Sequence, residues 1–254
     1  MRLNLSKPEI IRTFNRFHLG DNLIHLQFLR RIAQANPGLP IEHKAHAQYI
    51  PAMQMLITDL PQIQLTELTE QPEGFIDAWR GCNGFWYSHP KRHDFTAFHL
   101  EHFALLSERM GVPCPVKSAE DMLWDSPALQ PDTLANASVD VLIINSAPQS
   151  NQWPQYDAEK FLQLQRELRK KGLRTINSDE LRAQGWPIAV VGALAGQCQY
   201  VIGTAHGPFW VCRNVWANKT LKSIVAMTGN NENLDGLGAN VHTTTEIMDA
   251  LNFL

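Results

Sequence analysis

The chain has 254 residues, 44% hydrophobic and 19% charged, with a formal net charge of −3 at pH 7. This composition is typical of a protein with a buried core, and the lack of a basic excess argues against a general nucleic-acid binder. No apolar run has membrane-spanning length, and the first residues lack the apolar core of a signal peptide. The four cysteines show no CxxC spacing, so we expect reduced thiols in a cytoplasmic protein. Peripheral contact with the inner membrane surface stays open.

Strands and helices alternate in the first half of the chain. The pattern predicts a strand at residues 10–14, a helix over 23–35, a strand at 40–43 and a helix over 49–56. This order favours a parallel sheet covered by helices. A further strand is predicted at 81–87 and a helix over 98–110.

Residues 112–138 contain Pro113, Pro115, Pro127 and Pro131, a composition typical of a linker. After it the pattern restarts, with strands predicted at 139–145, 173–177, 200–203 and 221–227 and helices over 158–171, 188–197 and 244–251. We therefore predict an α/β fold with two Rossmann-like domains, residues 1–125 and 126–254.

The first candidate site is the turn after the first strand, with His18, Gly20, Asp21 and Asn22 as candidate substrate contacts. Gly20 would permit a sharp turn and the close approach of a ligand. Asp21 is then expected at or just before a helix N-terminus. A carboxylate there can act as general base toward a substrate hydroxyl, or it can cap the helix. The spacing alone favours the cap.

A second candidate is the loop over residues 146–154, which follows the strongest predicted strand. Backbone N–H groups and hydroxyls in such a loop can hold phosphate oxygens, and the loop contains no lysine or arginine. A plain surface loop is the alternative. The candidate donor contacts in this loop are Ser146, Gln149, Ser150, Asn151 and Trp153.

A third candidate is the turn that contains Gly203, Thr204, His206 and Gly207. Thr204, His206 and the N–H groups around Gly207 could bind a diphosphate, and a nearby anion would raise the pKa of His206. The alternative, a tight strand-to-helix turn with a buried histidine, stays open.

Four histidines lie close together in the sequence, His89, His93, His99 and His102, with Glu101 beside them. His99 and His102 share a helix face, but the segment is not an HExxH motif. We expect no metal site and no cofactor.

Three segments together resemble the heptosyltransferases of lipopolysaccharide synthesis, which have the GT-B glycosyltransferase fold. These are Leu19 to Leu29 with its Gly-Asp turn, Gln152-Trp153-Pro154 with the helix after it, and Gly192 to Pro208. The likeness spans most of the chain and keeps the order of the parts.

The resemblance implies a sugar transfer from a nucleotide diphosphate sugar to a hydroxyl of a glycan or glycolipid, with Asp21 as the catalytic base. It also implies donor binding by residues 146–154 and 203–210, across a cleft between two domains. The chain departs from the family pattern at three positions: Asn151 replaces a basic residue, Ala205 an acid and Trp210 a histidine. These departures favour either a different donor or, as the alternative, a catalytically inactive nucleotide- or sugar-binding protein.

Overall fold

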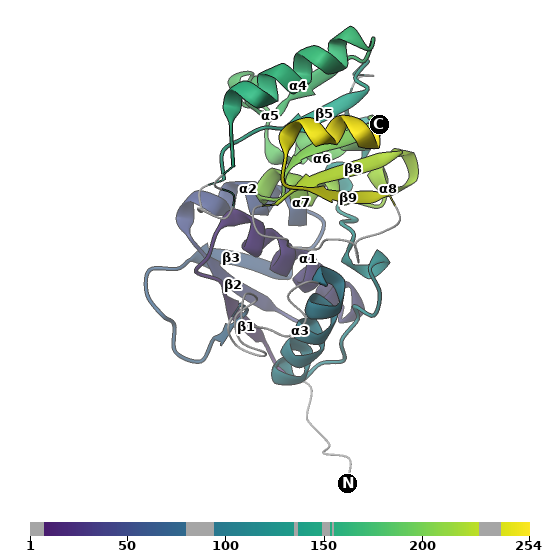
Figure 1. The fold of residues 1–254 in the computed structure, drawn as a ribbon. Coiled ribbons are helices and arrows are strands. Elements are labelled where there is room, and N and C mark those ends of the chain that lie inside the picture. The colour runs from purple at the N-terminus through teal and green to yellow at the C-terminus, as the bar shows by residue number, and fades with distance from the viewer. Residues whose placement is uncertain (1–7, 80–93, 135–136, 149–152, 154, 229–239) are drawn as a thin grey trace. The chain divides into compact units, whose positions relative to one another are not determined.

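A computed structural model describes residues 8–79, 94–134, 137–148, 153, 155–228 and 240–254. The chain divides into two compact units, and each contains one sheet of parallel strands (Figure 1). Unit 1 comprises residues 1–92 and 96–122, and unit 2 comprises residues 93–95 and 123–254. The predicted fold class, α/β with two Rossmann-like sheets, is confirmed.

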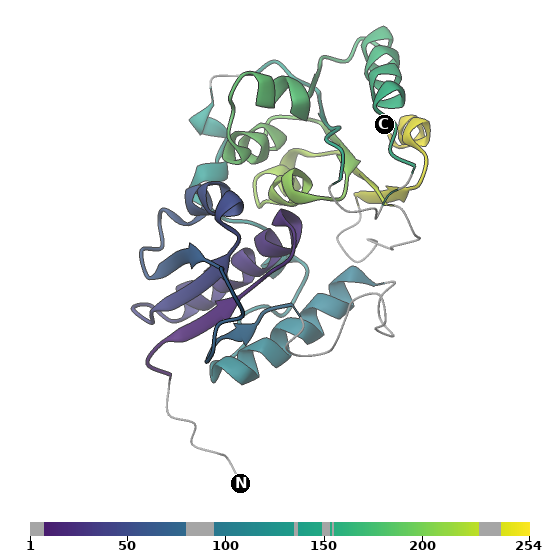
Figure 2. The ribbon, with the colours of Figure 1, turned by 90° about the vertical axis from the view of Figure 1, so that its left-hand side faces the viewer.

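The sheet of unit 1 has the strand order β3-β2-β1-β4 (Figure 2). Helices α1 and α3 pack together, with the rings of Phe28 and Phe103 stacked at 4.4 Å between centroids. The strands are β1 (Ile11–Phe14), β2 (Ile41–Ala45), β3 (Ile63–Glu67) and β4 (Ile76–Asp77), and the helices are α1 (Leu19–Ala35), α2 (Ile50–Gln54) and α3 (Phe95–Met110).

The sheet of unit 2 has the order β6-β5-β7-β8-β9, and all its neighbouring strands are parallel. Its strands are β5 (Val141–Ile144), β6 (Thr175–Asn177), β7 (Tyr200–Thr204), β8 (Ser223–Met227) and β9 (Val241–Thr244). Its helices are α4 (Ala158–Lys170), α5 (Ser178–Ala183), α6 (Ile188–Ala195), α7 (Gly207–Cys212) and α8 (Ala217–Thr220), followed by a 3₁₀ helix over Ile247–Phe253.

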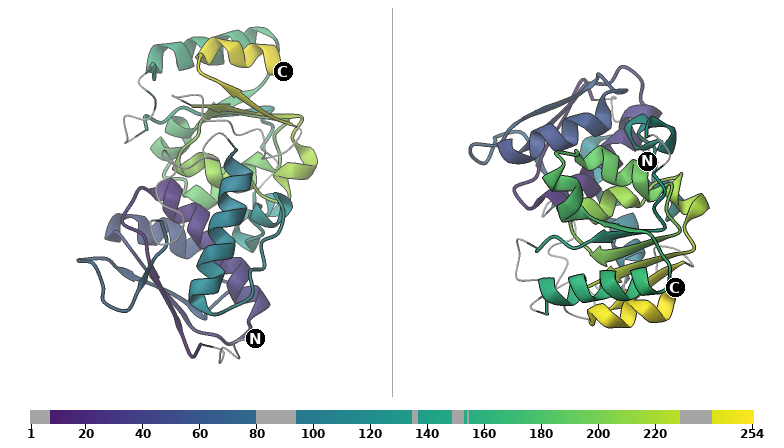
Figure 3. Two further views of the ribbon diagram at one scale, coloured as in Figure 1. Left: turned by 60° about the horizontal axis from the view of Figure 1, so that its bottom comes forward. Right: turned by 90° about the horizontal axis from the view of Figure 1, so that it is seen from above.

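Helix α4 and the C-terminal 3₁₀ helix cover the same face of this sheet (Figure 3). Asp157 caps α4 by accepting hydrogen bonds from the N–H groups of Glu159 and Lys160. The apolar side of α4, with Phe161, Leu164 and Leu168, packs on alternate residues of β5, as the period-two geometry of a strand requires. Side chains fill this face of the sheet, so we expect ligands to bind at the carboxyl ends of the strands and not on this face.

Most predicted strands are confirmed within two residues, but three boundaries and several elements differ. Helix α1 begins at Leu19 and not at residue 23, and α3 begins at Phe95 and not at residue 98. The C-terminal helix is a 3₁₀ helix that begins at Ile247 and not at residue 244. Strands β3, β4 and β9 and helices α5 and α8 were not predicted. With two and four residues, β4 and α8 are too short to show a period. The strand predicted at 81–87 lies outside the described residues. No helix within the described ranges is long and apolar enough to cross a bilayer.

Candidate functional site

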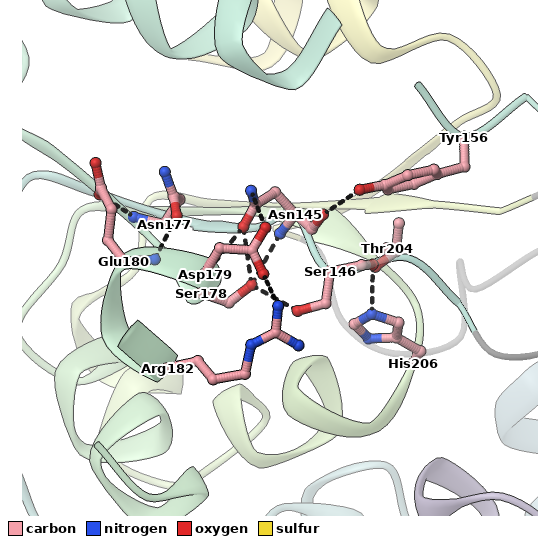
Figure 4. Close-up of polar contacts among 10 residues, drawn as sticks. All are labelled: Asn145, Ser146, Tyr156, Asn177, Ser178, Asp179, Glu180, Arg182, Thr204 and His206. Atoms are coloured by element: carbon pink, nitrogen blue, oxygen red, sulfur yellow. Dashed lines mark hydrogen bonds and ion pairs between the residues drawn. The ribbon is translucent and has the colours of Figure 1, made fainter. Parts of the chain in front are cut away.

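The carboxyl ends of β5 and β7 form the switch point of the second sheet. The chain passes from β5 outward to the edge strand β6 and then returns to β7 on the other side of β5. Open α/β sheets bind ligands outside the carboxyl ends of the strands at such a point. Ser146 follows β5 and His206 follows β7, so two of the predicted donor contacts meet there (Figure 4).

His206 joins the two strand ends by a side-chain hydrogen bond. Its Nε2 lies 2.7 Å from the carbonyl oxygen of Ser146, which only accepts, so Nε2 carries a proton. Its Nδ1 is buried and has no hydrogen-bond partner among the residues that the structure describes. Burial lowers the pKa of His206, with smaller opposing effects from its hydrogen bonds. The free protein therefore holds a neutral His206 whose buried Nδ1 can accept a hydrogen bond.

The other residues predicted in this turn serve packing. Thr204 is 2% exposed, and its hydroxyl donates to the carbonyl oxygens of Ile144 and Ser146, so it is not a free phosphate donor. Gly203 lies where β7 passes β5, and a Cβ there would meet the backbone of Ile144 at 2.5 Å. Gly207 is the buried first residue of α7. The predicted role of Thr204 as a diphosphate contact is wrong in this respect, because its hydroxyl is used within the protein.

A polar network that the sequence did not predict borders Ser146. Its members are Asn145, Ser178, Asp179 and Arg182 (Figure 4). Ser146 Oγ lies 2.9 Å from Ser178 Oγ, and Asn145 Nδ2 donates to Asp179 Oδ2 at 2.9 Å. Arg182 donates to Asp179 Oδ1 at 2.8 Å, with 77% of its side chain exposed.

This network could have been found from one local signal. Asn177 and Glu180 form a capping box at the start of α5, a spacing that marks a helix start directly after a predicted strand. That start brings Ser178 and Asp179 to the same sheet edge as Ser146, since β6 pairs with β5.

The remaining residues of the predicted loop divide into two groups. Trp153 is 4% exposed and packs in the core of unit 2 with Phe161, so its side chain is a core residue. Gln149, Ser150 and Asn151 lie outside the described residues.

The first sheet has its own switch point, between β1 and its neighbours β2 and β4. Asp21 is the third residue of α1, which follows β1, and is partly exposed. The N-cap of this helix is His18, so the alternative interpretation of Asp21 as the cap is wrong. A second carboxylate, Asp77, ends β4 at the same edge and lies 3.7 Å from the Arg16 guanidinium. Sequence reasoning missed it, because a two-residue strand has no recognisable period.

The other predicted contacts of the first turn have mixed positions. His18 is exposed, whereas Asn22 is fully buried and contacts the protein through both ends of its amide. Gly20 lies within α1 and is not among the glycines with positive φ. The predicted roles of Asn22 as a substrate contact and of Gly20 as a sharp turn are therefore wrong; the chain reverses over residues 15–18.

Four histidines are buried in unit 1: His25, His43, His99 and His102. His25 Nε2 lies 3.3 Å from His102 Nε2, and His102 Nε2 lies 2.8 Å from the carbonyl oxygen of Ala78. Burial is the main cause that lowers the pKa of His25 well below its ordinary value and the pKa of His43 to about 4. Of the side chains described, no group of three or more could hold a metal ion; His89 and His93 lie outside this part of the chain.

Buried neutral histidines make the stability of unit 1 depend on pH. Between pH 6.5 and about 4 the unfolded chain binds a proton at His43 that the folded protein does not. The free energy of unfolding should therefore fall as the pH falls, by on the order of 2 kcal/mol for His43 alone between pH 7.5 and 5. Hydrogen exchange of peptides from residues 8–79 at pH 7.5 and 5 measures this loss. His43→Gln should reduce the difference between the two pH values, and an equal difference in both proteins would contradict the assignment.

No protein-family model and no curated protein sequence matches the chain. Solved structures do match. The iron-containing dodecameric glycosyltransferase TibC from enterotoxigenic E. coli H10407 has a TM-score of 0.55 and 17% identity over 91% of this chain. A family 9 glycosyl transferase from Veillonella parvula has a TM-score of 0.54 and 16% identity, over 98% of this chain and 89% of its own.

E. coli heptosyltransferase WaaC, solved with ADP, has a TM-score of 0.55 and 13% identity over 95% of this chain and 98% of its own. The chain spans only 62% of the length of TibC. At these identities the likeness establishes the fold, which is that of GT-B glycosyltransferases and resembles the heptosyltransferases. It confirms the predicted resemblance at the level of structure.

Proposed function

We propose that this protein is a glycosyltransferase that moves a sugar from a nucleotide diphosphate sugar to a hydroxyl of a glycan or glycolipid. Lipopolysaccharide or another surface glycan is the proposed product. The fold shared with WaaC, which was solved with ADP, supports a nucleotide diphosphate donor. We keep the division into an acceptor domain, residues 1–125, and a donor domain, residues 126–254. The proposed site of action is the cytoplasmic side of the inner membrane, with peripheral contact to a glycolipid acceptor.

The donor is proposed to bind at the carboxyl ends of β5 and β7. The observation that carries this assignment is the buried, unpartnered Nδ1 of His206 at the switch point of the sheet. A diphosphate there would raise the pKa of His206, so that Nδ1 takes up a proton. The Nδ1–H group would then donate a hydrogen bond to a phosphate oxygen. Arg182, whose side chain is mostly exposed, can turn toward the same anion. Ser146, Gln149, Ser150, Asn151 and the N–H of Gly207 complete the proposed donor contacts.

The proposed chemistry is a displacement at the anomeric carbon of the donor sugar. Asp21 takes the proton of the acceptor hydroxyl while its oxygen forms the new glycosidic bond, with His18 as a further acceptor contact. The bond to the diphosphate breaks, and the negative charge that develops there is met by His206, Arg182 and backbone N–H groups. The proposal needs neither a metal nor another cofactor.

The alternative function is a nucleotide- or sugar-binding protein without turnover. It is favoured by the three positions at which the chain lacks the family's charged residues, Asn151, Ala205 and Trp210. Loss of a lysine at a diphosphate removes a charge-assisted hydrogen bond, about 1.5–3 kcal/mol. The same donor site serves both functions, so binding and turnover must be measured separately.

Calorimetric titration with ADP tests the donor site directly. We expect binding that weakens as the pH rises from 6 to 8, because the free His206 has a lowered pKa and takes up a proton when the anion binds. His206→Gln should raise the Kd about tenfold, the equivalent of one hydrogen bond to a charged group, and should abolish this pH dependence.

His242→Gln is the matched control, because His242 lies on β9 and stacks on Phe253 away from the switch point. It should leave the Kd unchanged. Binding without turnover would support the alternative function. No binding of ADP or any other nucleoside diphosphate to the wild-type protein would refute both.

A further inference from the structure

Two buried pairs of an asparagine and a histidine hold the turn that leads into α1. The pairs are Asn15 with His25 and Asn22 with His43, and none of the four side chains is more than 1% exposed. The turn between them, residues 15–18, joins the end of β1 to the helix that carries Asp21. Both pairs contact this turn.

Asn22 binds the turn from the helix side. Its Nδ2 donates to the carbonyl oxygens of Phe17 and His18, each at 3.0 Å. Both carbonyls only accept, so the orientation of the amide is fixed and its Oδ1 faces His43 Nε2 at 3.4 Å. His43 must therefore carry its proton on Nε2 and accept at Nδ1 from the Thr13 hydroxyl, 2.8 Å away on β1. This chain of contacts links the turn to the middle of the sheet.

Asn15 binds the turn from the strand side. Its Oδ1 accepts from the N–H of Phe17 at 2.9 Å, and its own N–H donates to Lys44 on β2 at 2.9 Å. Its Nδ2 lies 2.6 Å from His25 Nδ1. His25 lies on α1, one helical turn after Asp21. The second pair therefore ties the turn to the helix that carries the proposed base.

The burial of these polar groups is unfavourable unless they are satisfied, and apolar side chains would fill the same space without that penalty. The amides add a fixed geometry, because the hydrogen bonds of Asn15 and Asn22 hold the N–H of Phe17 and the carbonyl groups of Phe17 and His18 in place. Satisfied polar networks of this kind make a local conformation unique. A carboxylate that must meet a hydroxyl proton within hydrogen-bond reach needs such a fixed backbone.

We propose that Asn22 and Asn15, together with His43 and His25, are positioning residues that hold Asp21 in its reactive place. The inference rests on the proposed sugar transfer. It assigns them no contact with substrate, and it explains why Asn22 is buried beside Asp21 at the start of the helix.

A double-mutant cycle with Asp21→Asn tests this inference. We expect Asn22→Leu, which keeps the size of the side chain but removes both amide bonds, to lower kcat at least tenfold with the KM for the donor unchanged. In the Asp21→Asn background the same substitution should change the residual kcat less than twofold, because the residue acts through Asp21. An equal loss in both backgrounds would show a general structural defect and overturn the proposal.

Asn36→Leu is the matched control on the same helix. Asn36 is also buried and donates through Nδ2 to a carbonyl, that of Ile32 at 2.9 Å, but at the other end of α1. It should leave kcat within twofold of the wild-type value. Should Asn22→Leu fail to fold, Asn22→Ser, which keeps one donor, is expected to lower kcat by a smaller factor in the same pattern.

Hydrogen exchange of the amides of residues 17–22 separates this inference from the proposed function, because it needs no turnover. Asn22→Leu or Asn22→Ser should accelerate exchange there at least tenfold, and Asn36→Leu should not. Unchanged exchange in the Asn22 variants would refute the positioning role. If exchange accelerates in the Asn22 variants but the wild-type protein transfers no sugar, the proposed function is refuted, and with it the catalytic role of the turn. The two asparagines would then still hold the turn as described.

Discussion

Asp21→Asn should lower the kcat of sugar transfer by about 10² to 10⁴, the contribution of a positioned general base. The substitution keeps the shape of the side chain but removes the oxygen that takes up the hydroxyl proton. The Kd for ADP should stay within twofold of the wild-type value, because the proposed donor contacts all belong to unit 2. Release of nucleotide diphosphate over time and calorimetric titration measure the two quantities independently.

The charge of Asp21 also contributes to helix stability, so a control is needed. Asp21 is an acidic residue in the first turn of α1, where it interacts favourably with the helix dipole by about 0.3–1 kcal/mol. Glu159 is likewise an acidic residue in the first turn of its helix, α4. Glu159→Gln should therefore cause a similar small loss of stability and no change in turnover. An Asp21→Asn protein that keeps kcat within threefold would remove Asp21 from the mechanism.

Gly203→Ala should destabilise unit 2 by about 3 kcal/mol or more, the upper range for overpacking a core. A Cβ at this position would lie against the Cβ of Ile144, 2.5 Å from its carbonyl oxygen and 2.8 Å from its Cα. Two of these three atoms are backbone atoms, and all three belong to β5, which cannot move without breaking its ladder to β6 and β7. Urea unfolding followed by hydrogen exchange of unit 2 peptides measures the loss.

The same substitution should abolish ADP binding even where the protein stays folded. Separation of β5 from β7 would pull Ser146 away from His206, whose hydrogen bond joins the two strand ends. Gly196→Ala is the comparison, because its Cβ would meet the ring of Pro131 at 2.5 Å, whereas the backbone atom nearest to it, the carbonyl oxygen of Ala193, lies at 3.3 Å. We expect that variant to lose less than half as much stability and to bind ADP. Equal losses in the two variants would contradict the packing role of Gly203.

The switch-point position of His206 has a consequence for the donor. Because its Nε2 is held by Ser146, only Nδ1 can respond to the ligand, and the free histidine is neutral. A diphosphate would raise the pKa of His206, so that Nδ1 takes up a proton from the solvent. The hydroxyl of a neutral sugar would instead donate a hydrogen bond to the unprotonated Nδ1. The pH dependence of binding therefore distinguishes these two classes of ligand at this residue.

The sequence by itself determined the α/β class and the place of the turns at strand ends. Both depend on local signals: β-branched runs such as Val139 to Asn145, apolar residues at helical spacing, and Gly or Pro at the ends of helices. Short elements such as β4 and α5 were not predicted, because a few residues show too little periodicity to be distinguished from a loop.

Only the tertiary structure decided which polar residues face a ligand and which support the backbone. Asn22 and Thr204 belong to candidate motifs, yet both are buried and donate hydrogen bonds to carbonyl oxygens of the protein itself. Ser178 and Asp179 stand in no motif but reach Asn145 and Ser146 because β6 pairs with β5. Strand order and side-chain burial are set by contacts between residues far apart in the chain, and spacing along the sequence does not record them.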